Sequence, residues 1–132
     1  MTARGLLDNR LQFIKHKGHA IFVIDFSQCN AKELLLLLEM VRVSIGRHEP
    51  GSMLCLADFT GAHFDKQVAT KAKEVLVLDR PFVKKSAWVG TESLPAVFYE
   101  NFKSFSQRDF PKFKSREEAL DWLVAEEGKS QQ

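Results

Sequence analysis

Short apolar runs of strand length alternate with helical segments along most of the chain. The first two runs are rich in valine, isoleucine and phenylalanine, which favour β-strands, and turn-forming residues separate the runs from the helices. They cover residues 11–15, 20–26, 52–58, 83–89 and 110–114. Strands that alternate with helices favour a parallel sheet, because the chain must cross over between parallel strands and a helix supplies that crossover. The sequence therefore predicts an α/β fold with a mostly parallel sheet of about five strands.

The connections between these runs predict an N-terminal antiparallel hairpin and four helices. Lys17-Gly18-His19 lies between the first two strands and is typical of a hairpin turn. Asn30 can cap a helix over residues 31–45, and Ser115 with Glu118 forms a capping box at the start of the last helix. The other two helices are predicted over residues 65–79 and from about residue 93.

The 132 residues are the length of one domain, and neither a linker nor an internal repeat divides them. We expect a single domain with its core over about 11–124 and a frayed tail over 128–132. Residues 1–10 lack the apolar core of a secretion signal, and the apolar run 34–38 is far shorter than the roughly 20 residues of a membrane span. Cys29 and Cys55 show no metal-ligand spacing, so we expect reduced thiols and a cytoplasmic protein.

Five segments, taken in order, resemble the SpoIIAA-like family. They are residues 20–26, the leucine-rich helix, the strand end Leu56-Ala57-Asp58-Phe59-Thr60-Gly61-Ala62, the strand end Trp88-Val89-Gly90, and the closing Ser115-Arg116-Glu117-Glu118-Ala119-Leu120-Asp121-Trp122-Leu123. The family consists of small bacterial proteins of the STAS-like and SEC14-like group, and the resemblance covers about residues 11–124. It implies a SpoIIAA-like α/β fold, a cytoplasmic protein and a family largely without an assigned biochemical activity.

The resemblance raises the question of a phosphorylation switch, because STAS anti-sigma factor antagonists carry one. In those proteins a strand that ends in Asp is followed by an Asp-Ser-Ser-Gly-type turn, and a serine of that turn is phosphorylated. Here the strand ends at Asp58 and Phe64-Asp65 resembles the start of the turn, but Lys66 and Gln67 follow. Neither side chain accepts a phosphoryl group as serine does, so the chemical basis of the switch is missing at this position. Thr60 is the nearest hydroxyl, and we interpret it as a turn residue.

Open parallel sheets bind ligands beyond the carboxyl ends of their strands, and the residues of that rim can be named from the sequence. The candidate ligand rim consists of Asp25, Ser27, Asp58, Thr60, Gly61, Gly90, Thr91 and Glu92. Carboxylates there would suit a hard cation such as Mg²⁺, and the helix start beside Ser93 would suit an anion. Asp, Ser and Thr are also ordinary turn and cap residues, and no glycine-rich phosphate loop is present. The sequence therefore defines a rim but predicts no cofactor and no metal.

No catalytic constellation stands out in the sequence. The four histidines show no metal-ligand spacing with one another, and no Gly-x-Ser-x-Gly motif occurs. His63 is the histidine nearest the rim, so an enzyme that used it with Asp58 and Glu92 is a distant alternative. Cys29 stands near a helix start, where thiolates are favoured, but without a partner histidine it is better interpreted as a packed small side chain. We predict a protein that is not an enzyme.

A basic segment with interleaved phenylalanines covers residues 103–116. Its charged residues are Lys103, Arg108, Lys112, Lys114 and Arg116 against Asp109, and its aromatic residues are Phe105, Phe110 and Phe113. Such a pattern can bind single-stranded nucleic acid or anionic lipid headgroups, but it is also typical of an edge strand that lysines protect. The net charge of the chain is only +2, so nucleic acid is not the expected partner. In a strand, Phe110 and Phe113 would point to opposite faces of the sheet.

The helix over residues 31–45 is apolar on two arcs. The first arc should face the sheet and contains Leu34, Leu37, Leu38, Val41 and Ile45. The second arc contains Leu36, Met40 and Val43. A neighbouring helix, a second subunit or an apolar ligand could cover this second arc, and symmetric association makes a homodimer the sharper hypothesis.

These observations favour a non-enzymatic STAS-like regulatory or protein-interaction module. The alternative is a SEC14-like binder of a lipid or another apolar ligand, in which Phe98 and Phe102 of the third helix would line the pocket.

Overall fold

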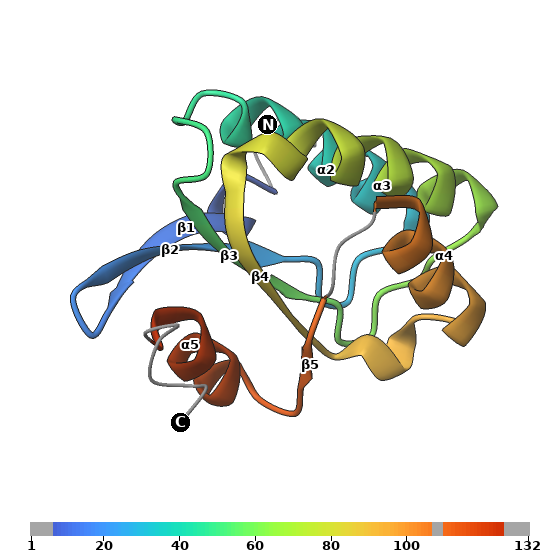
Figure 1. Cartoon of the computed structure of the whole chain (residues 1–132). Coiled ribbons are helices and arrows are strands. Elements are labelled where there is room, and N and C mark those ends of the chain that lie inside the picture. The colour runs from blue at the N-terminus through green and yellow to red at the C-terminus, as the bar shows by residue number, and fades with distance from the viewer. Residues whose placement is uncertain (1–6, 107–109, 126–132) are drawn as a thin grey trace.

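A computed structural model describes residues 7–106 and 110–125, and its centre is a five-stranded sheet (Figure 1). The strands follow one another across the sheet in sequence order: β1 (Leu11–His16), β2 (His19–Asp25), β3 (Met53–Asp58), β4 (Val83–Val89) and β5 (Lys112–Phe113). The helices are α2 (Ala31–Ile45), α3 (Lys66–Asp79), α4 (Ala96–Ser106) and α5 (Arg116–Val124). The short 3₁₀ turns are η1 (Asp8–Arg10), η2 (Arg80–Phe82) and η3 (Thr91–Ser93). The predicted tail 128–132 lies outside the described residues.

The sheet is mixed, as predicted: β1 pairs with β2 in an antiparallel hairpin, and β2 to β5 are parallel. Gly18 in the hairpin turn has a φ of 85°, a conformation that glycine adopts without a steric penalty. Each parallel connection leads to the neighbouring strand in the same direction across the sheet. Because such crossovers share one handedness, their helices all lie on the same face of the sheet. Figure 1 shows α2, α3 and α4 on one side of the sheet and α5 on the other. Across 7–106 and 110–125, no helix is long and apolar enough to cross a membrane.

Alternating side chains of the strands divide the interior into two cores, one on each face of the sheet. Ile24 and Trp88 belong to the larger core beneath α2, α3 and α4. Val23 and Val89 belong to the smaller core, which Leu123 of α5 helps to close. Side chains alternate along a strand, so a residue two positions after Val23, at the end of its strand, also points toward α5.

Two helices begin where the sequence predicts, because their first turns are capped by neighbouring side chains. In α2, Asn30 Oδ1 accepts a hydrogen bond from Glu33 N at 2.8 Å, and Glu33 Oε1 accepts one from Asn30 N at 2.9 Å. At the start of α5, the Ser115 hydroxyl accepts a hydrogen bond from Glu118 N at 3.2 Å. Both partners of each cap lie within one helical turn, so the local sequence is sufficient to identify them.

Two predicted elements begin two or more residues later in the structure, and proline explains both. α4 begins at Ala96 rather than near Ser93, because Leu94 precedes Pro95 and is extended, with a ψ of 132°. β5 covers only Lys112–Phe113 instead of 110–114, because Pro111 has no N–H to donate to a strand ladder. The Pro111 carbonyl still accepts a hydrogen bond from the backbone of β4, at 3.0 Å.

The phenylalanines at the end of the basic segment lie on opposite faces of the sheet, as their spacing predicts. Phe110 is buried and stacks on Trp88, with ring centroids 4.4 Å apart. Phe113 is half-buried and lies against Trp122 of α5, with ring centroids 5.6 Å apart. Both side chains are therefore used in packing. Outside the described part of the chain lie Arg108 and the side chains of Lys103 and Phe105.

Replacing Phe110 by alanine should destabilise the fold far more than replacing Phe13. Phe110 is 1% exposed, so its truncation leaves a cavity that costs about 3–5 kcal/mol. Phe13 on β1 is 52% exposed, and its truncation should cost about 1 kcal/mol or less. Denaturant unfolding followed by circular dichroism would measure both free energies. Equal losses would contradict the placement of Phe110 in the core.

Candidate functional site

Asp25 and Asp58 end two neighbouring parallel strands and face each other in the register of β2 and β3. Their side chains leave the sheet on the α5 side, because Val23 and Leu56, two positions earlier, belong to the core beneath α5. Two carboxylates side by side disfavour each other's charge unless cations neutralise them. This pair of carboxylates therefore requires positively charged side chains nearby.

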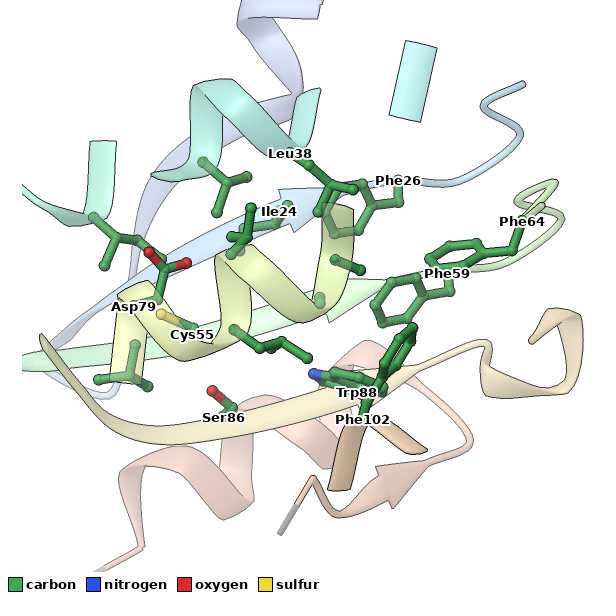
Figure 2. Close-up of a pocket in the computed structure, with 17 residues that line it drawn as sticks. Ile24, Phe26, Leu38, Cys55, Phe59, Phe64, Asp79, Ser86, Trp88 and Phe102 are labelled. Carbon is green, nitrogen blue, oxygen red and sulfur yellow. The ribbon is translucent and has the colours of Figure 1, made fainter. Parts of the chain in front are cut away.

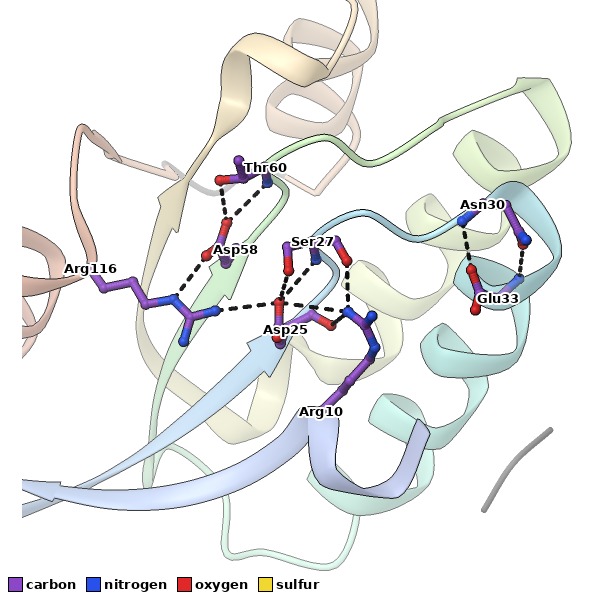
Figure 3. Close-up of polar contacts among 8 residues, drawn as sticks. All are labelled: Arg10, Asp25, Ser27, Asn30, Glu33, Asp58, Thr60 and Arg116. Carbon is purple, nitrogen blue, oxygen red and sulfur yellow. Dashed lines mark hydrogen bonds and ion pairs between the residues drawn. The ribbon is translucent and has the colours of Figure 1, made fainter. Parts of the chain in front are cut away.

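Asp58 is buried and uses both of its carboxylate oxygens. Oδ1 accepts hydrogen bonds from the amide and the hydroxyl of Thr60, at 3.0 and 2.7 Å, and Oδ2 accepts one from Arg116 Nε at 2.8 Å (Figure 3). Burial acts to raise the pKa of Asp58, but the hydrogen bonds from Thr60 and the guanidinium of Arg116 outweigh it, so the pKa lies below its usual value. Asp58 is therefore a stably ionised group at neutral pH.

Asp25 repeats this arrangement one strand away. Its Oδ1 accepts hydrogen bonds from the amide of Ser27 at 3.0 Å and from the hydroxyl of Ser27 at 2.5 Å. Arg116 Nη2 lies 3.3 Å from the same oxygen, and Arg10 Nη1 lies 3.8 Å from it. Arg10 also donates to the backbone carbonyls of Asp25 and Ser27, at 3.1 and 2.7 Å. Two guanidinium groups thus neutralise two carboxylates, and Arg116 bridges both acids (Figure 3).

The shared geometry comes from a short repeat in the sequence. Asp25-Phe26-Ser27 and Asp58-Phe59-Thr60 each place a hydroxyl residue two positions after the acid, where an Asp side chain can bind its own backbone. The two phenylalanines stack in the larger core, with ring centroids 5.1 Å apart. Gln28 N donates to Thr60 O at 2.9 Å, so the two turns stay paired beyond the ends of their strands.

The other predicted rim residues form the turns around this network. Gly90 has a φ of 71°, and a side chain there would come within 2.3 Å of the Thr60 hydroxyl. Gly61 lies in the turn after β3 with a φ of 69°. Thr91 and Glu92 lie in η3. Glu92 is exposed and forms no ion pair with a residue that the structure describes, so it does not join the two aspartates.

The rim holds charge but leaves few groups free for chemistry. Among residues 7–106 and 110–125, no three His, Cys, Asp or Glu side chains lie where they could hold a metal ion together. His63 is exposed, and within the same ranges no hydrogen bond joins its ring to Asp58 or Glu92. The side chain of Arg116 is 45% exposed, against 10% for Asp58. Arg116 is therefore the member of the network that a partner could reach most easily.

The two arginines of the network are absent from the predicted rim. The pattern at residues 115–118 identifies Arg116 only as part of a capping box, and it lies 58 residues from Asp58 in the sequence. Arg10 precedes the first strand, so its sequence context does not indicate the carboxylates that it meets. The sequence signal that could have indicated these arginines is the repeat Asp-Phe-Ser and Asp-Phe-Thr, because two adjacent carboxylates that are partly buried require cations.

The structure separates the three residues of the second arc of α2. Met40 is buried in the larger core, because α3 packs beside α2 and covers that side (Figure 1). Leu36 and Val43 are half-buried and keep contact with solvent. Met40 is thus part of the interior of this chain, whereas Leu36 and Val43 lie at its surface.

Cys29, close to the start of α2, is a packed side chain rather than an activated thiol. It is fully buried in the larger core. Burial raises the pKa of the thiol, and the nearby Arg10 guanidinium only partly opposes this effect. The neutral thiol is therefore the stable form.

An apolar cavity lies between the sheet and the helices α2 and α3, next to one of the predicted pocket residues. Its volume is about 60 Å³, and aromatic side chains gather at one end of it: Phe26, Phe59, Phe64, Trp88 and Phe102 (Figure 2). Phe98 is half-buried with its ring centroid 6.5 Å from that of Phe102, but it does not line the cavity. Ligand pockets usually have roughly 300–1,000 Å³, so this cavity has room only for a small apolar group.

The strand order and the arrangement of helices define the class of fold: the chain has a SpoIIAA-like α/β fold, as the sequence resemblance implies. It is similar to an uncharacterised protein from the DUF3478 family of Shewanella loihica PV-4, whose crystal structure is described as having a SpoIIAA-like fold. The two structures superpose with a TM-score of 0.66 at 14% sequence identity, over 86% of this chain and 92% of that chain. No protein-family model and no curated protein matches the chain.

Acid should weaken the fold through Asp58. The pKa of Asp58 in the folded chain lies below its ordinary value of about 4. The contribution of the ionised carboxylate is therefore fully present above about pH 4 and is lost as the pH falls through the folded pKa. Asp58→Asn should lower the free energy of unfolding at neutral pH and reduce the further loss in acid.

Urea unfolding at a series of pH values would measure this effect. Arg116→Gln should flatten the same acidic part of the profile, because it removes one hydrogen bond and the positive charge beside Asp58. Glu117→Gln, an exposed position in α5, is the control and should leave the profile unchanged. An Asp58→Asn profile parallel to that of the unmodified chain would contradict the assignment.

Proposed function

We propose that the protein belongs to the SpoIIAA-like family and acts in the cytoplasm as a STAS-like regulatory or protein-interaction module, by binding rather than by catalysis. The observation that carries this proposal is the engagement of the rim carboxylates: both oxygens of Asp58 and Oδ1 of Asp25 are held by their own turns and by Arg116. A general base or a metal ligand needs a free lone pair at the reacting site. Cys29 and Cys55 are buried and form no disulfide, which agrees with a reducing compartment.

The outward face of α2 is the surface that such a module would offer to a protein partner. Leu35 and Leu36 are half-buried there: they pack against the edge of the larger core and keep part of their surface in solvent. They lie in a depression whose other lining residues are Leu7, Asn30, Lys32, Glu33, Glu39 and Lys71. Apolar side chains framed by charged ones are typical of a protein interface, with a dry centre and a polar rim.

Site-specific photo-crosslinking in cells tests this function. A photoreactive phenylalanine analogue at position 36 should give one discrete adduct with a second polypeptide, and Leu35→Glu in the same chain should abolish that adduct, because it places a charge in the apolar centre of the surface. The matched control carries the analogue at Glu117 on α5 and should give no such adduct. The absence of any adduct from position 36 would refute the proposed function.

The apolar cavity supports a second candidate, a SEC14-like binder of a lipid or another apolar ligand. Its lining includes Phe102, one of the two residues that the sequence indicates for such a pocket. Because the volume is about 60 Å³, a ligand longer than a small apolar group would have to displace α4 or its side chains. Support for this candidate therefore requires direct detection of a ligand bound to the protein.

Native mass spectrometry of freshly purified protein tests the second candidate. A bound ligand should appear as a discrete mass above the 15.1 kDa of the chain. Ala72 is buried and lines the cavity, so Ala72→Leu should fill the space and remove the added mass. Bare chain in every charge state of the unmodified protein would count against lipid binding.

A further inference from the structure

A stripe of residues runs along the outward face of α2, and we call it the α2 stripe. Lys32, Leu36, Glu39 and Val43 recur at intervals of four, three and four residues, and Leu35 lies beside Leu36. Lys32 is exposed, and the other four side chains are half-buried. The stripe therefore has an apolar centre with a cation toward its N-terminal end and an anion toward its C-terminal end.

The α2 stripe is complementary to itself. Lys32 and Glu39 lie equally far from the midpoint between Leu35 and Leu36, one on each side. When two such helices run antiparallel about a two-fold axis through that midpoint, Lys32 of each copy faces Glu39 of the other, and the Leu35 and Leu36 side chains of both copies meet around the axis. Antiparallel helices also place the positive end of each macrodipole beside the negative end of the other. A parallel pair about a two-fold axis would instead oppose like charges.

The charges of the stripe are held where a second copy could reach them. Lys32 forms no ion pair with a residue that the structure describes. Glu39 accepts hydrogen bonds from Arg42 and from Lys71 Nζ, the latter at 2.7 Å, and these bonds lower its pKa to about 2. The Glu39 side chain is still 38% exposed. It is therefore an oriented, permanently ionised carboxylate at the surface.

We propose that the α2 stripe binds a second copy of this chain, in a symmetric antiparallel contact of α2 with α2. This inference rests on the proposed function, because it names the partner of the surface that the interaction module presents. The contact contains Leu35 and Leu36 at its centre, with Lys32 and Glu39 paired on either side. Met40, which belongs to the sequence-predicted interface, lies in the interior of the chain and takes no part.

The mass of the purified full chain in solution is the first measurement. Sedimentation equilibrium should show the mass rising from 15.1 kDa toward twice that value as the protein concentration increases. Leu36→Glu should raise the dissociation constant on the order of a hundredfold, because it removes two apolar side chains from the centre of the contact. Val77→Glu on α3 makes the same chemical change at a 43% exposed position and should leave the dissociation constant unchanged.

A charge exchange tests the antiparallel register. Lys32→Glu alone makes two pairs of carboxylates face each other across the axis, and Glu39→Lys alone makes two pairs of ammonium groups do so. Each variant should dimerise about tenfold more weakly than the unmodified chain. An equimolar mixture should recover the original dissociation constant, because every pair in the mixed dimer is then between opposite charges. A folding defect cannot produce recovery on mixing.

The outcomes separate this inference from the proposed function. A mixture of folded variants that stays as weak as its components, or an unmodified chain of 15.1 kDa at about 1 mM, would overturn the contact. Glu39→Lys faces Arg42 and Lys71 and can fail to fold for that reason. In that case the dissociation constants of Lys32→Glu and Leu36→Glu are compared with that of the control Val77→Glu. A monomeric chain whose position 36 cross-links to a different protein overturns the second copy and supports the module. A monomeric chain with no adduct overturns both.

Discussion

Two carboxylates in register at the ends of neighbouring parallel strands impose a demand that the rest of the rim satisfies. Asp25 and Asp58 point to the same side of the sheet, so their mutual repulsion must be offset by cations. Arg10 comes from the turn before β1 and Arg116 from the first turn of α5. The rim thereby joins segments from both ends of the described chain to the middle of the sheet. A loss of either arginine would leave negative charge in a partly buried site.

The two faces of the sheet depend on different interactions. Three helices and a large apolar core cover one face, whereas α5, with nine residues, is the one described helix on the other. A helix of that length is marginal by itself in water, so its stability must come from the contacts it makes. Arg116 meets Asp58 at its start, Asp121 accepts a hydrogen bond from His16 at 2.7 Å, and Lys85 donates to a carbonyl near its end at 2.8 Å. These polar contacts with separate strands therefore act together with the apolar packing of Ala119 and Leu123 to place α5.

Local signals account for what the sequence predicts, and distant contacts account for what it does not. The cap at Asn30 and the alternation of strands and helices lie within single turns or connections, so the order of elements and the fold class follow from them. The rim could be listed from the strand ends, but its pairing with Arg116 depends on how α5 docks. Met40 likewise falls on the second arc of α2, away from the arc expected to face the sheet, and it is buried because α3 packs beside α2.

The simple order of strands also suits assembly while the chain is being synthesised. Each strand pairs with the strand before it in the sequence, so no strand has to insert between two that are already paired. The sheet can grow in one direction, with α2, α3 and α4 docking on the same face as they emerge, and this locality favours rapid folding. α5 is made last among the described elements. Closure of the second core and neutralisation of the two aspartates are therefore completed in the same step, when Arg116 reaches the rim.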